Sequence, residues 1–197
     1  MMNDRLNVAI VGCGGIAGMK HIPAIRANAD LARLVALQDL DPARAQALAQ
    51  KCEGDVRVYA TVEELLADDR IDVVHVCTPN ITHAPVSIAA MRAGKHVLCE
   101  KPMAATAQQA RQMFRAAEEN EGVLMEAMRS LYTPGFARLC GLVQAVGPVR
   151  SARIPYAKYS SRYGLVCQGR PTNIFSTEFA TGALMDLGVY CVNLALG

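Results

Sequence analysis

The sequence has no tryptophan, few aromatic residues and almost no excess of charge of either sign. Its 197 residues include 20 Lys or Arg and 18 Asp or Glu, so the formal net charge is only +2. The basic residues stand singly or in pairs, and without a basic stripe to follow a phosphate backbone we expect no nucleic acid partner. With 52% hydrophobic residues the chain is too apolar for disorder and long enough for a sizeable core. These features predict a globular protein of about a domain and a half.

The cysteines lack the spacings of a metal site or a disulfide framework. Their number is odd, they are widely spaced, and no C-x-x-C pair or Cys/His cluster occurs at zinc spacing. We therefore predict no metal site and a location in the reducing cytoplasm. The seven are Cys13, Cys52, Cys77, Cys99, Cys140, Cys167 and Cys191.

Long uninterrupted apolar runs are also missing. The apolar opening at residues 6–19 contains four glycines, which is unlike a signal peptide. No run approaches the roughly 20 apolar residues of a membrane span. We therefore expect no membrane partner and no export.

Short apolar runs alternate with longer helical patterns through the first two thirds of the chain. This alternation is typical of βαβ units and predicts an α/β fold with a doubly wound parallel sheet. Helix starts are readable where Asp41 precedes Pro42 and where Thr61 and Thr106 open capping boxes. The six predicted strands cover 7–11, 34–38, 57–59, 73–77, 96–99 and 123–126.

The pattern changes after residue 128. A helix is predicted at 134–146, a strand-like extended run at 149–159, a loop to about 177 and a helix at 183–196. A lone strand leaves its ladder groups unpaired, so this last third must pack on the first domain and a partner, or the chain is cut short. We place a dinucleotide-binding domain at 1–128 and a partial α+β substrate domain at 129–197.

The strand at 7–11 runs into the pattern G-x-G-x-x-A at the start of a helix. Gly12 permits a tight turn, Gly14 lets the backbone approach a pyrophosphate, and the small Ala17 lets helix and strand pack closely. Gly15 and Ile16 complete the first helical turn, whose N-terminus would hold the anion. A glycine turn also has purely structural uses, but its place after the first of six strands predicts a Rossmann-type dinucleotide-binding site.

A carboxylate is expected at the end of the second strand, where the adenosine ribose hydroxyls lie. Asp39 stands there, 25 residues after Gly14. Asp41 is the competitor, but a position just before a proline is better explained as a helix N-cap. Asp39 would repel a 2′-phosphate, although Arg44 could shield one, so we predict NAD or NADP with NAD preferred.

The residues Thr78, Pro79, Asn80 and His83 follow the fourth strand. Ligands bind at this carboxyl edge, where the strand order should reverse, so we include all four in the cofactor site. Thr78 and Asn80 could instead cap the helix that begins near residue 81. For His83, a surface position in the first helical turn is a simpler interpretation than catalysis.

Glu100 and Lys101 follow the fifth strand at the same edge. Most loop lysines are only solvated, but one beside the nicotinamide can bind a substrate oxygen and favour ionisation of a proton donor. On the closing helix, Asp186, Tyr190 and Asn193 lie within about 60° of one another at helical spacing. An ordinary amphipathic surface helix is the alternative for that pattern.

Together these residues resemble the glucose-fructose oxidoreductase/inositol dehydrogenase/MocA (Gfo/Idh/MocA) family of nicotinamide-dependent oxidoreductases. The resemblance spans nearly the whole chain in the expected order. Tyr190 is similar to the tyrosine of the branch that includes dihydrodiol dehydrogenases, which often uses NADP and so conflicts with the preference inferred from Asp39. The matching pieces are the G-x-G-G-I-A turn, 78–80 with His83, 93–97 leading into Glu100-Lys101-Pro102, 126–127, and 182–190.

The resemblance implies hydride transfer between a nicotinamide and the CH–OH group of a sugar, polyol or cyclic diol. It assigns catalysis to Tyr190 as the acid/base, Lys101 as the cation that favours phenolate, and Asp186 as an orienting group. It implies a polyhydroxylated small-molecule substrate and leaves a homo-oligomer open. Because family members continue into several antiparallel strands behind this site, we expect a C-terminally truncated member. A non-catalytic dinucleotide-binding module is the alternative.

Overall fold

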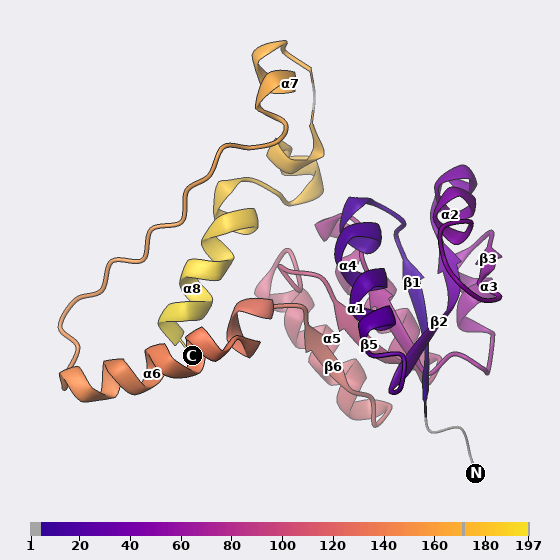
Figure 1. The fold of residues 1–197 in the computed structure, drawn as a ribbon, viewed down its shortest axis with the longest axis horizontal. Helices are drawn as coiled ribbons and strands as arrows, with labels where there is room; N and C mark the ends of the chain where they lie inside the picture. The colour runs from indigo at the N-terminus through magenta and orange to yellow at the C-terminus, as the bar shows by residue number, and fades with distance from the viewer. Residues whose placement is uncertain (1–4, 171, 197) are drawn as a thin grey trace. The chain divides into compact units, whose positions relative to one another are not determined.

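The structure, a computed structural model, describes residues 5–170 and 172–196. The chain divides into two compact units, Met1–Glu126 and Ala127–Gly197. Figure 1 follows the elements of both units from indigo at the N-terminus to yellow at the C-terminus.

A six-stranded sheet forms the centre of the first unit (Figure 1), and each of its strand pairs is parallel. The order is β3-β2-β1-β4-β5-β6, so the direction of winding reverses between β1 and β4. Ligands of such sheets bind beyond the carboxyl ends of the strands at this reversal. The predicted doubly wound sheet is confirmed, with strand ends moved by at most two residues. The strands are β1 (Leu6–Val11), β2 (Ala32–Gln38), β3 (Arg57–Tyr59), β4 (Val73–Val76), β5 (His96–Cys99) and β6 (Leu124–Glu126).

Helices cover both faces of this sheet. In β1, Val8 and Ile10 belong to a buried cluster with residues of α1 and α2, whereas Ala9 and Val11 belong to a second cluster with residues of α3, α4 and α5. Burial on both faces explains why the strands are nearly continuous apolar runs. The helices are α1 (Ile22–Ala27), preceded by the π-helical turn η1 (Ala17–His21), α2 (Pro42–Ala49), α3 (Val62–Leu66), α4 (Asn80–Arg92) and α5 (Ala107–Glu119).

The three predicted N-caps are present. The side chains of Asp41, Thr61 and Thr106 each accept a hydrogen bond from a first-turn backbone N–H, at 3.1–3.2 Å. In the box opened by Thr61, the returning carboxylate of Glu64 accepts from the backbone N–H of Ala60 at 3.3 Å, one residue before the cap. Local capping chemistry therefore determines where these helices begin.

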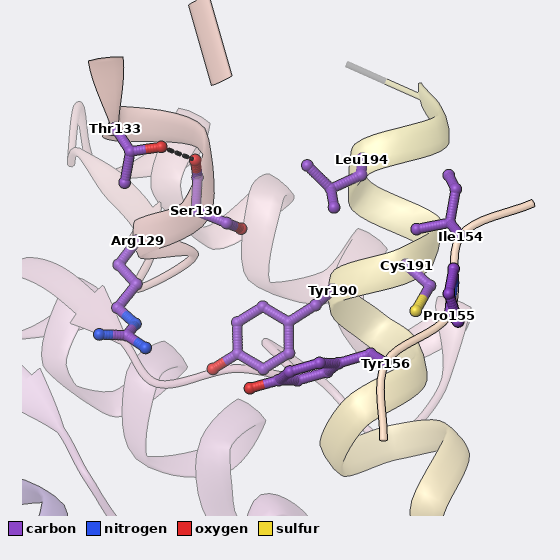
Figure 2. Close-up of a pocket in the computed structure, with 9 residues that line it drawn as sticks. All are labelled: Arg129, Ser130, Thr133, Ile154, Pro155, Tyr156, Tyr190, Cys191 and Leu194. Atoms are coloured by element: carbon purple, nitrogen blue, oxygen red, sulfur yellow. Dashed lines mark hydrogen bonds between the residues drawn. The ribbon is translucent and has the colours of Figure 1, made fainter. Parts of the chain in front are cut away.

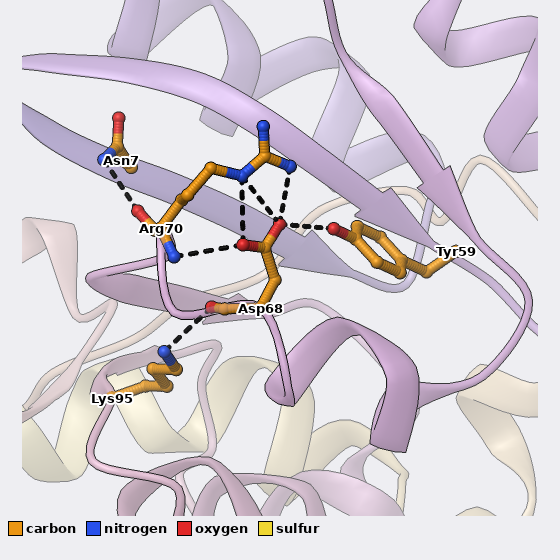
Figure 3. A network of polar contacts seen from close by, with 5 residues as sticks. All are labelled: Asn7, Tyr59, Asp68, Arg70 and Lys95. Atoms are coloured by element: carbon orange, nitrogen blue, oxygen red, sulfur yellow. Dashed lines mark hydrogen bonds and ion pairs between the residues drawn. The ribbon is translucent and has the colours of Figure 1, made fainter.

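A polar network joins the loop before β4 to β1, to β3 and to the start of β5 (Figure 3). The guanidinium of Arg70 donates to both carboxylate oxygens of Asp68, with Nη2 to Oδ2 at 2.7 Å, and the hydroxyl of Tyr59 donates to Oδ2. Lys95 Nζ donates to the Asp68 carbonyl at 2.9 Å, and Asn7 Nδ2 donates to the Arg70 carbonyl at 2.6 Å. The hydrogen bonds from Arg70, and then that from Tyr59, hold the pKa of the Asp68 carboxyl well below its usual range.

Replacing Asp68 with asparagine is expected to lower the free energy of unfolding at neutral pH by about 2 kcal/mol, because charge-assisted hydrogen bonds are lost. The folded pKa lies below the unfolded value of about 3.9, so the contribution is complete above that value and disappears as pH falls through the folded pKa. Urea denaturation from neutral pH down to about pH 2 should therefore show the two proteins converging. A loss that stays constant over this range would contradict the electrostatic origin. Asp69→Asn, at an exposed neighbouring carboxylate, is the matched control.

The described residues of the second unit form helices and no strand. The predicted helix at 134–146 is confirmed, and the predicted helix at 183–196 corresponds to a π-helical turn followed by an α-helix. The predicted strand at 149–159 is wrong, because no strand among the described residues shares its backbone hydrogen bonds. The helices are η2 (Arg129–Tyr132), α6 (Pro134–Val146), α7 (Tyr163–Cys167), η3 (Asn173–Phe175), η4 (Thr177–Phe179), η5 (Leu184–Gly188) and α8 (Val189–Leu196).

By length and composition the segment Thr177–Leu196 is apolar enough to cross a membrane, and none of its most apolar window is buried. The backbone interrupts it, since Ala180 has a φ of 51° and Gly182 a φ of 129°. The five residues of η5 and the eight of α8 together reach about 20 Å, less than the roughly 30 Å of a bilayer's hydrocarbon core. Within the residues that the structure describes, the helix that follows Gly182 is therefore shorter than a membrane span.

Candidate functional site

The glycine loop after β1 passes directly against the end of β4. Gly12 has a φ of +96°, and a Cβ there would lie 2.7 Å from the carbonyl carbon and oxygen of Cys77. Its N–H donates to the Gln38 carbonyl at 2.8 Å, so the loop is tied to β2 as well. At Gly14, by contrast, a Cβ would meet nothing within 4 Å. A residue without a side chain is required at Gly12, and the backbone at Gly14 is open to a ligand.

The loop leads into the helical turn η1. Ala17 is fully buried, and a Cβ on Gly18 would lie 3.3 Å from Cδ1 of Leu48 in α2. Small residues therefore let η1 approach both the sheet and α2. The first N–H groups of a helix have no acceptor within it, so the turn that contains Gly15 and Ile16 suits an anion.

Asp39 links the end of β2 to the glycine loop. Its Oδ2 accepts from the Cys13 N–H at 2.7 Å and its Oδ1 from the Asp41 N–H at 2.9 Å. Each carboxylate oxygen keeps a second lone pair with which a ribose hydroxyl could bond. Burial, and then the Asp39 carboxylate, raises the pKa of the Cys13 thiol to about 12, so the thiol is neutral. Arg44 Nε lies 3.3 Å from Oδ2 of Asp41, the N-cap of α2, so Arg44 forms its ion pair with Asp41.

The segment after β4 differs from the expectation in two respects. α4 begins at Asn80 with Pro79 at the cap position, and no side chain caps it. Thr78 Oγ1 is buried with no hydrogen-bond partner among the described residues, so Thr78 does not cap the helix. His83 is 1% exposed, so its interpretation as a surface histidine is wrong. Its ring is held inside because Nδ1 lies 2.8 Å from the Pro102 carbonyl and Nε2 2.9 Å from the Thr78 carbonyl.

The Glu100–Lys101 loop lies at the carboxyl edge of β5. The Glu100 N–H donates to the Val76 carbonyl at 2.9 Å, which places the loop beside the end of β4. Glu100 Oε2 accepts from the Lys101 N–H at 3.1 Å, and the Lys101–Pro102 bond is cis. Lys101 is thus delivered to the same edge as the glycine loop and Thr78.

In the second unit a pocket of about 430 Å³ lies between η2, the segment after α6, and α8 (Figure 2). The rings of Tyr156 and Tyr190 meet edge to face with centroids 5.5 Å apart. In Figure 2 both hydroxyls point toward the side of the pocket where Arg129 lies. Ser130 Oγ, also in the lining, is buried without a hydrogen-bond partner in the described chain. The lining is Arg129, Ser130, Thr133, Ile154, Pro155, Tyr156, Tyr190, Cys191 and Leu194.

The other two polar residues of the closing helix do not line this pocket. Asp186 lies in the π-helical turn η5, where its N–H donates to the Gly182 carbonyl at 2.8 Å, and Asn193 lies in α8. Because a π-turn closes over more residues than an α-turn, the helical spacing assumed from Asp186 to Tyr190 does not hold through η5. Of the predicted catalytic residues, Lys101 belongs to the first unit and Asp186 and Tyr190 belong to the second.

Two pairs of polar residues, one near Glu100 and one in the pocket of the second unit, were not predicted from the sequence. His21 and His75 contact each other through their Nδ1 atoms at 3.0 Å beside Glu100, and Arg129 and Tyr156 share the pocket with Tyr190. A histidine inside the apolar strand V-V-H-V was the available signal for His75. Nothing local marks Tyr156, since its partner is distant in the sequence.

Comparison with known proteins gives a consistent result. Residues 6–128 match the Gfo/Idh/MocA family model, described as an oxidoreductase family with an NAD-binding Rossmann fold. The chain is 37% identical over 160 residues to scyllo-inositol 2-dehydrogenase (NADP(+)) of Bacillus subtilis, covering 81% of this chain and 48% of that protein. It is 35% identical to trans-1,2-dihydrobenzene-1,2-diol dehydrogenase of Danio rerio, covering 83% of this chain and 47% of that protein.

Solved structures extend the likeness to the second unit. The crystal structure of GenD2 from gentamicin A biosynthesis, in complex with NAD, is similar with a TM-score of 0.79 and 30% identity. That match covers 98% of this chain and 53% of GenD2. The chain spans about half the length of the curated relatives it matches.

Proposed function

Because the chain belongs to the Gfo/Idh/MocA oxidoreductase family, we propose that it transfers a hydride between a nicotinamide cofactor and the CH–OH carbon of a sugar, polyol or cyclic diol. The matched domain is an NAD-binding Rossmann fold. The observation that carries the proposal is the shape of its carboxyl edge. There Gly12 has no room for a side chain, Gly14 is open, and Thr78 presents a buried hydroxyl with no partner in the described chain.

These residues fit a dinucleotide. Gly12, Gly14, Gly15, Ile16 and Ala17 would hold the pyrophosphate against the first turn of η1, where backbone N–H groups favour negative charge. A buried hydroxyl without a partner is costly, and a bound polar group would satisfy Thr78 Oγ1.

The remaining predicted contacts lie along the same edge. Asp39 would bind the adenosine ribose, and Thr78, Pro79 and Asn80 would border the nicotinamide half together with Glu100 and Lys101. Both ring nitrogens of His83 face backbone carbonyls, so the ring packs between Thr78 and Pro102 and its neutral form donates to one of these two carbonyls.

In the proposed reaction, a nicotinamide held by these residues would supply the hydride acceptor or donor. Tyr190 removes a proton from the substrate hydroxyl, or returns one, through its phenol oxygen. The ammonium group of Lys101 favours the phenolate form and binds the reacting oxygen. Asp186 orients the substrate hydroxyls by accepting their hydrogen bonds.

A second candidate is a dinucleotide-binding module without turnover. The observation in its favour is that none of the described residues of α6, α7 and α8 in the second unit is buried. Turnover by the purified protein with any polyol, aldose or cyclic diol, in the presence of NAD or NADP, would exclude it.

We propose NAD as the preferred cofactor, because the Asp39 carboxylate would repel a 2′-phosphate. NADH and NADPH should both be detected by quenching of their fluorescence, with NADH bound more tightly. Asp39→Asn should shift the ratio of the two affinities toward NADPH by about tenfold, the equivalent of ~1.4 kcal/mol.

The ratio of the NADH and NADPH affinities is informative, because a loosened glycine loop would weaken the binding of both cofactors equally. The lost charge would change only the difference between the two affinities. Asp30→Asn, at an exposed carboxylate that precedes β2 where Asp39 follows it, is the control and should leave the ratio unchanged. An unchanged ratio in Asp39→Asn would refute the role of Asp39. Failure of both cofactors to bind would refute the proposed function.

A further inference from the structure

A chain of hydrogen bonds runs under the carboxyl edge of the sheet from β4 to the Lys101 loop. In β4, Val74 and Val76 are buried on one face, and His75 lies between them on the other. The rings of His75 and His21 are 5.0 Å apart at 64°, with their Nδ1 atoms at 3.0 Å. His21 comes from η1, so the contact joins the middle of the sheet to the helix that follows the glycine loop.

The chain continues from His21 to Glu100. His21 is 7% exposed, and its Nε2 lies 2.9 Å from Glu100 Oε1. Since a carboxylate can only accept, the proton between these atoms is carried by Nε2 of His21. Burial, and then the neighbouring His21, lowers the pKa of His75 to about 3, so His75 is neutral at physiological pH. The contact between the two Nδ1 atoms then holds one proton, supplied by either ring.

The residues on either side of Lys101 are each held by a buried histidine. On one side, His21 bonds the Glu100 carboxylate, whose second oxygen accepts from the Lys101 N–H. On the other side, His83 Nδ1 bonds the Pro102 carbonyl. Lys101 is therefore the central residue of a loop whose two neighbours are both fixed by side chains from other elements.

Two further hydrogen bonds complete the arrangement. The Met103 N–H donates to Glu126 Oε1 at 2.7 Å, and the Glu100 N–H donates to the Val76 carbonyl at 2.9 Å. The backbone of 100–103 is thus bonded to β4, α4 and β6, and the side chain of Glu100 is bonded to η1. A surface loop that only presented a solvated lysine would not need a buried partner on each side.

We propose that His21, supported by His75, is a positioning residue that holds Glu100 and through it the backbone of Lys101, with His83 as its counterpart at Pro102. The proposal rests on the proposed function, in which Lys101 binds the reacting oxygen. His21 does not touch the substrate in this arrangement. Without its donor, Glu100 regains rotamer freedom and the direction of Lys101 relative to the reacting atoms is no longer determined.

The test compares His21→Leu, which removes the donor, with His21→Gln, whose amide N–H₂ can occupy the position of Nε2. In steady-state kinetics on the intact protein, His21→Leu should lower kcat by about tenfold to a hundredfold with cofactor affinity changed less than about twofold. His21→Gln should restore most of kcat. His96→Leu is the matched control, because His96 also makes a hydrogen bond but stands at the opposite end of β5.

Two further readouts separate positioning from a general structural defect. The double variant His21→Leu/His75→Leu should be no slower than His21→Leu alone, because His75 acts through His21. In ¹H–¹⁵N spectra, the Lys101 amide should shift in His21→Leu and return toward its wild-type position in His21→Gln. This second measurement needs no turnover, so it tests the positioning even where the proposed function fails.

Wild-type kcat in His21→Leu, or an unmoved Lys101 amide, overturns the proposal. Equal losses in His21→Leu and His21→Gln overturn it as well. If His21→Leu does not fold, the shift of the Lys101 amide is measured in His21→Gln and in the His75→Leu single variant instead. An unchanged amide in His75→Leu would then show that the chain does not support the loop.

Discussion

Replacing Tyr190 with phenylalanine is expected to lower kcat by about 10²- to 10⁴-fold, because it removes the proposed proton donor and acceptor. Replacing Lys101 with methionine should have an effect of similar size, since the cation that favours phenolate and binds the reacting oxygen is lost. Both variants should keep NADH affinity within about twofold of wild type, because the pyrophosphate and ribose contacts are elsewhere. Initial rates of NAD or NADP reduction with a responsive polyol, aldose or cyclic diol measure the effect.

The matched controls are Tyr159→Phe and Lys158→Met, both at exposed positions of the second unit. They should retain wild-type turnover. Tyr190→Phe keeps the ring that meets the Tyr156 ring edge to face, so it should preserve this ring contact. Near-normal turnover in both Tyr190→Phe and Lys101→Met would refute the catalytic assignment.

Gly12→Ala is expected to destabilise the first unit by about 3 kcal/mol or more, through backbone strain and overpacking together. The added Cβ would lie 2.7 Å from the carbonyl carbon and oxygen of Cys77 and 2.8 Å from the Thr78 nitrogen, and these backbone atoms belong to the sheet edge. The φ of +96° adds strain for any residue with a side chain. Thermal unfolding should show a lower midpoint than wild type, and NADH fluorescence should no longer be quenched.

Gly14→Ala separates folding from binding. Its Cβ would meet nothing within 4 Å, so the thermal midpoint should stay close to that of wild type. NADH affinity should nevertheless fall, because the methyl group stands where a pyrophosphate approaches the backbone. A Gly12→Ala protein as stable as Gly14→Ala would contradict the close approach of the loop to β4.

Much of the first unit is predictable because its signals are local. Because β1 is buried on both faces, its sequence is an apolar run that can be recognised as a strand. The caps at Asp41, Thr61 and Thr106 define the starts of helices, and each of these side chains accepts from an N–H only two or three residues away. The place of Gly12 follows from the same logic, since a strand that turns sharply into a helix needs a residue tolerant of positive φ.

The errors arise where a distant partner decides the outcome. His83 has the sequence context of a surface residue in a first helical turn, but carbonyls from two loops hold it inside. The run at 149–159 has strand-like residues, yet a strand exists only where another one accepts its hydrogen bonds. His21 and His75 are 54 residues apart, and only the packing of η1 on β4 brings them together.

Asp39 combines two tasks in one carboxylate, and this limits how cofactor preference could change in evolution or by design. The same two oxygens that would select the ribose also accept the Cys13 and Asp41 N–H groups, which tie the glycine loop to the start of α2. Asp39→Asn, which removes only the charge, keeps one acceptor oxygen, so one of those two N–H groups would lose its acceptor. Asp39→Asn alone should shift the affinity ratio toward NADPH, but a full change of preference to NADP also needs a replacement acceptor for that N–H group and a cation for the phosphate. Such a full change should therefore proceed through at least two coupled substitutions.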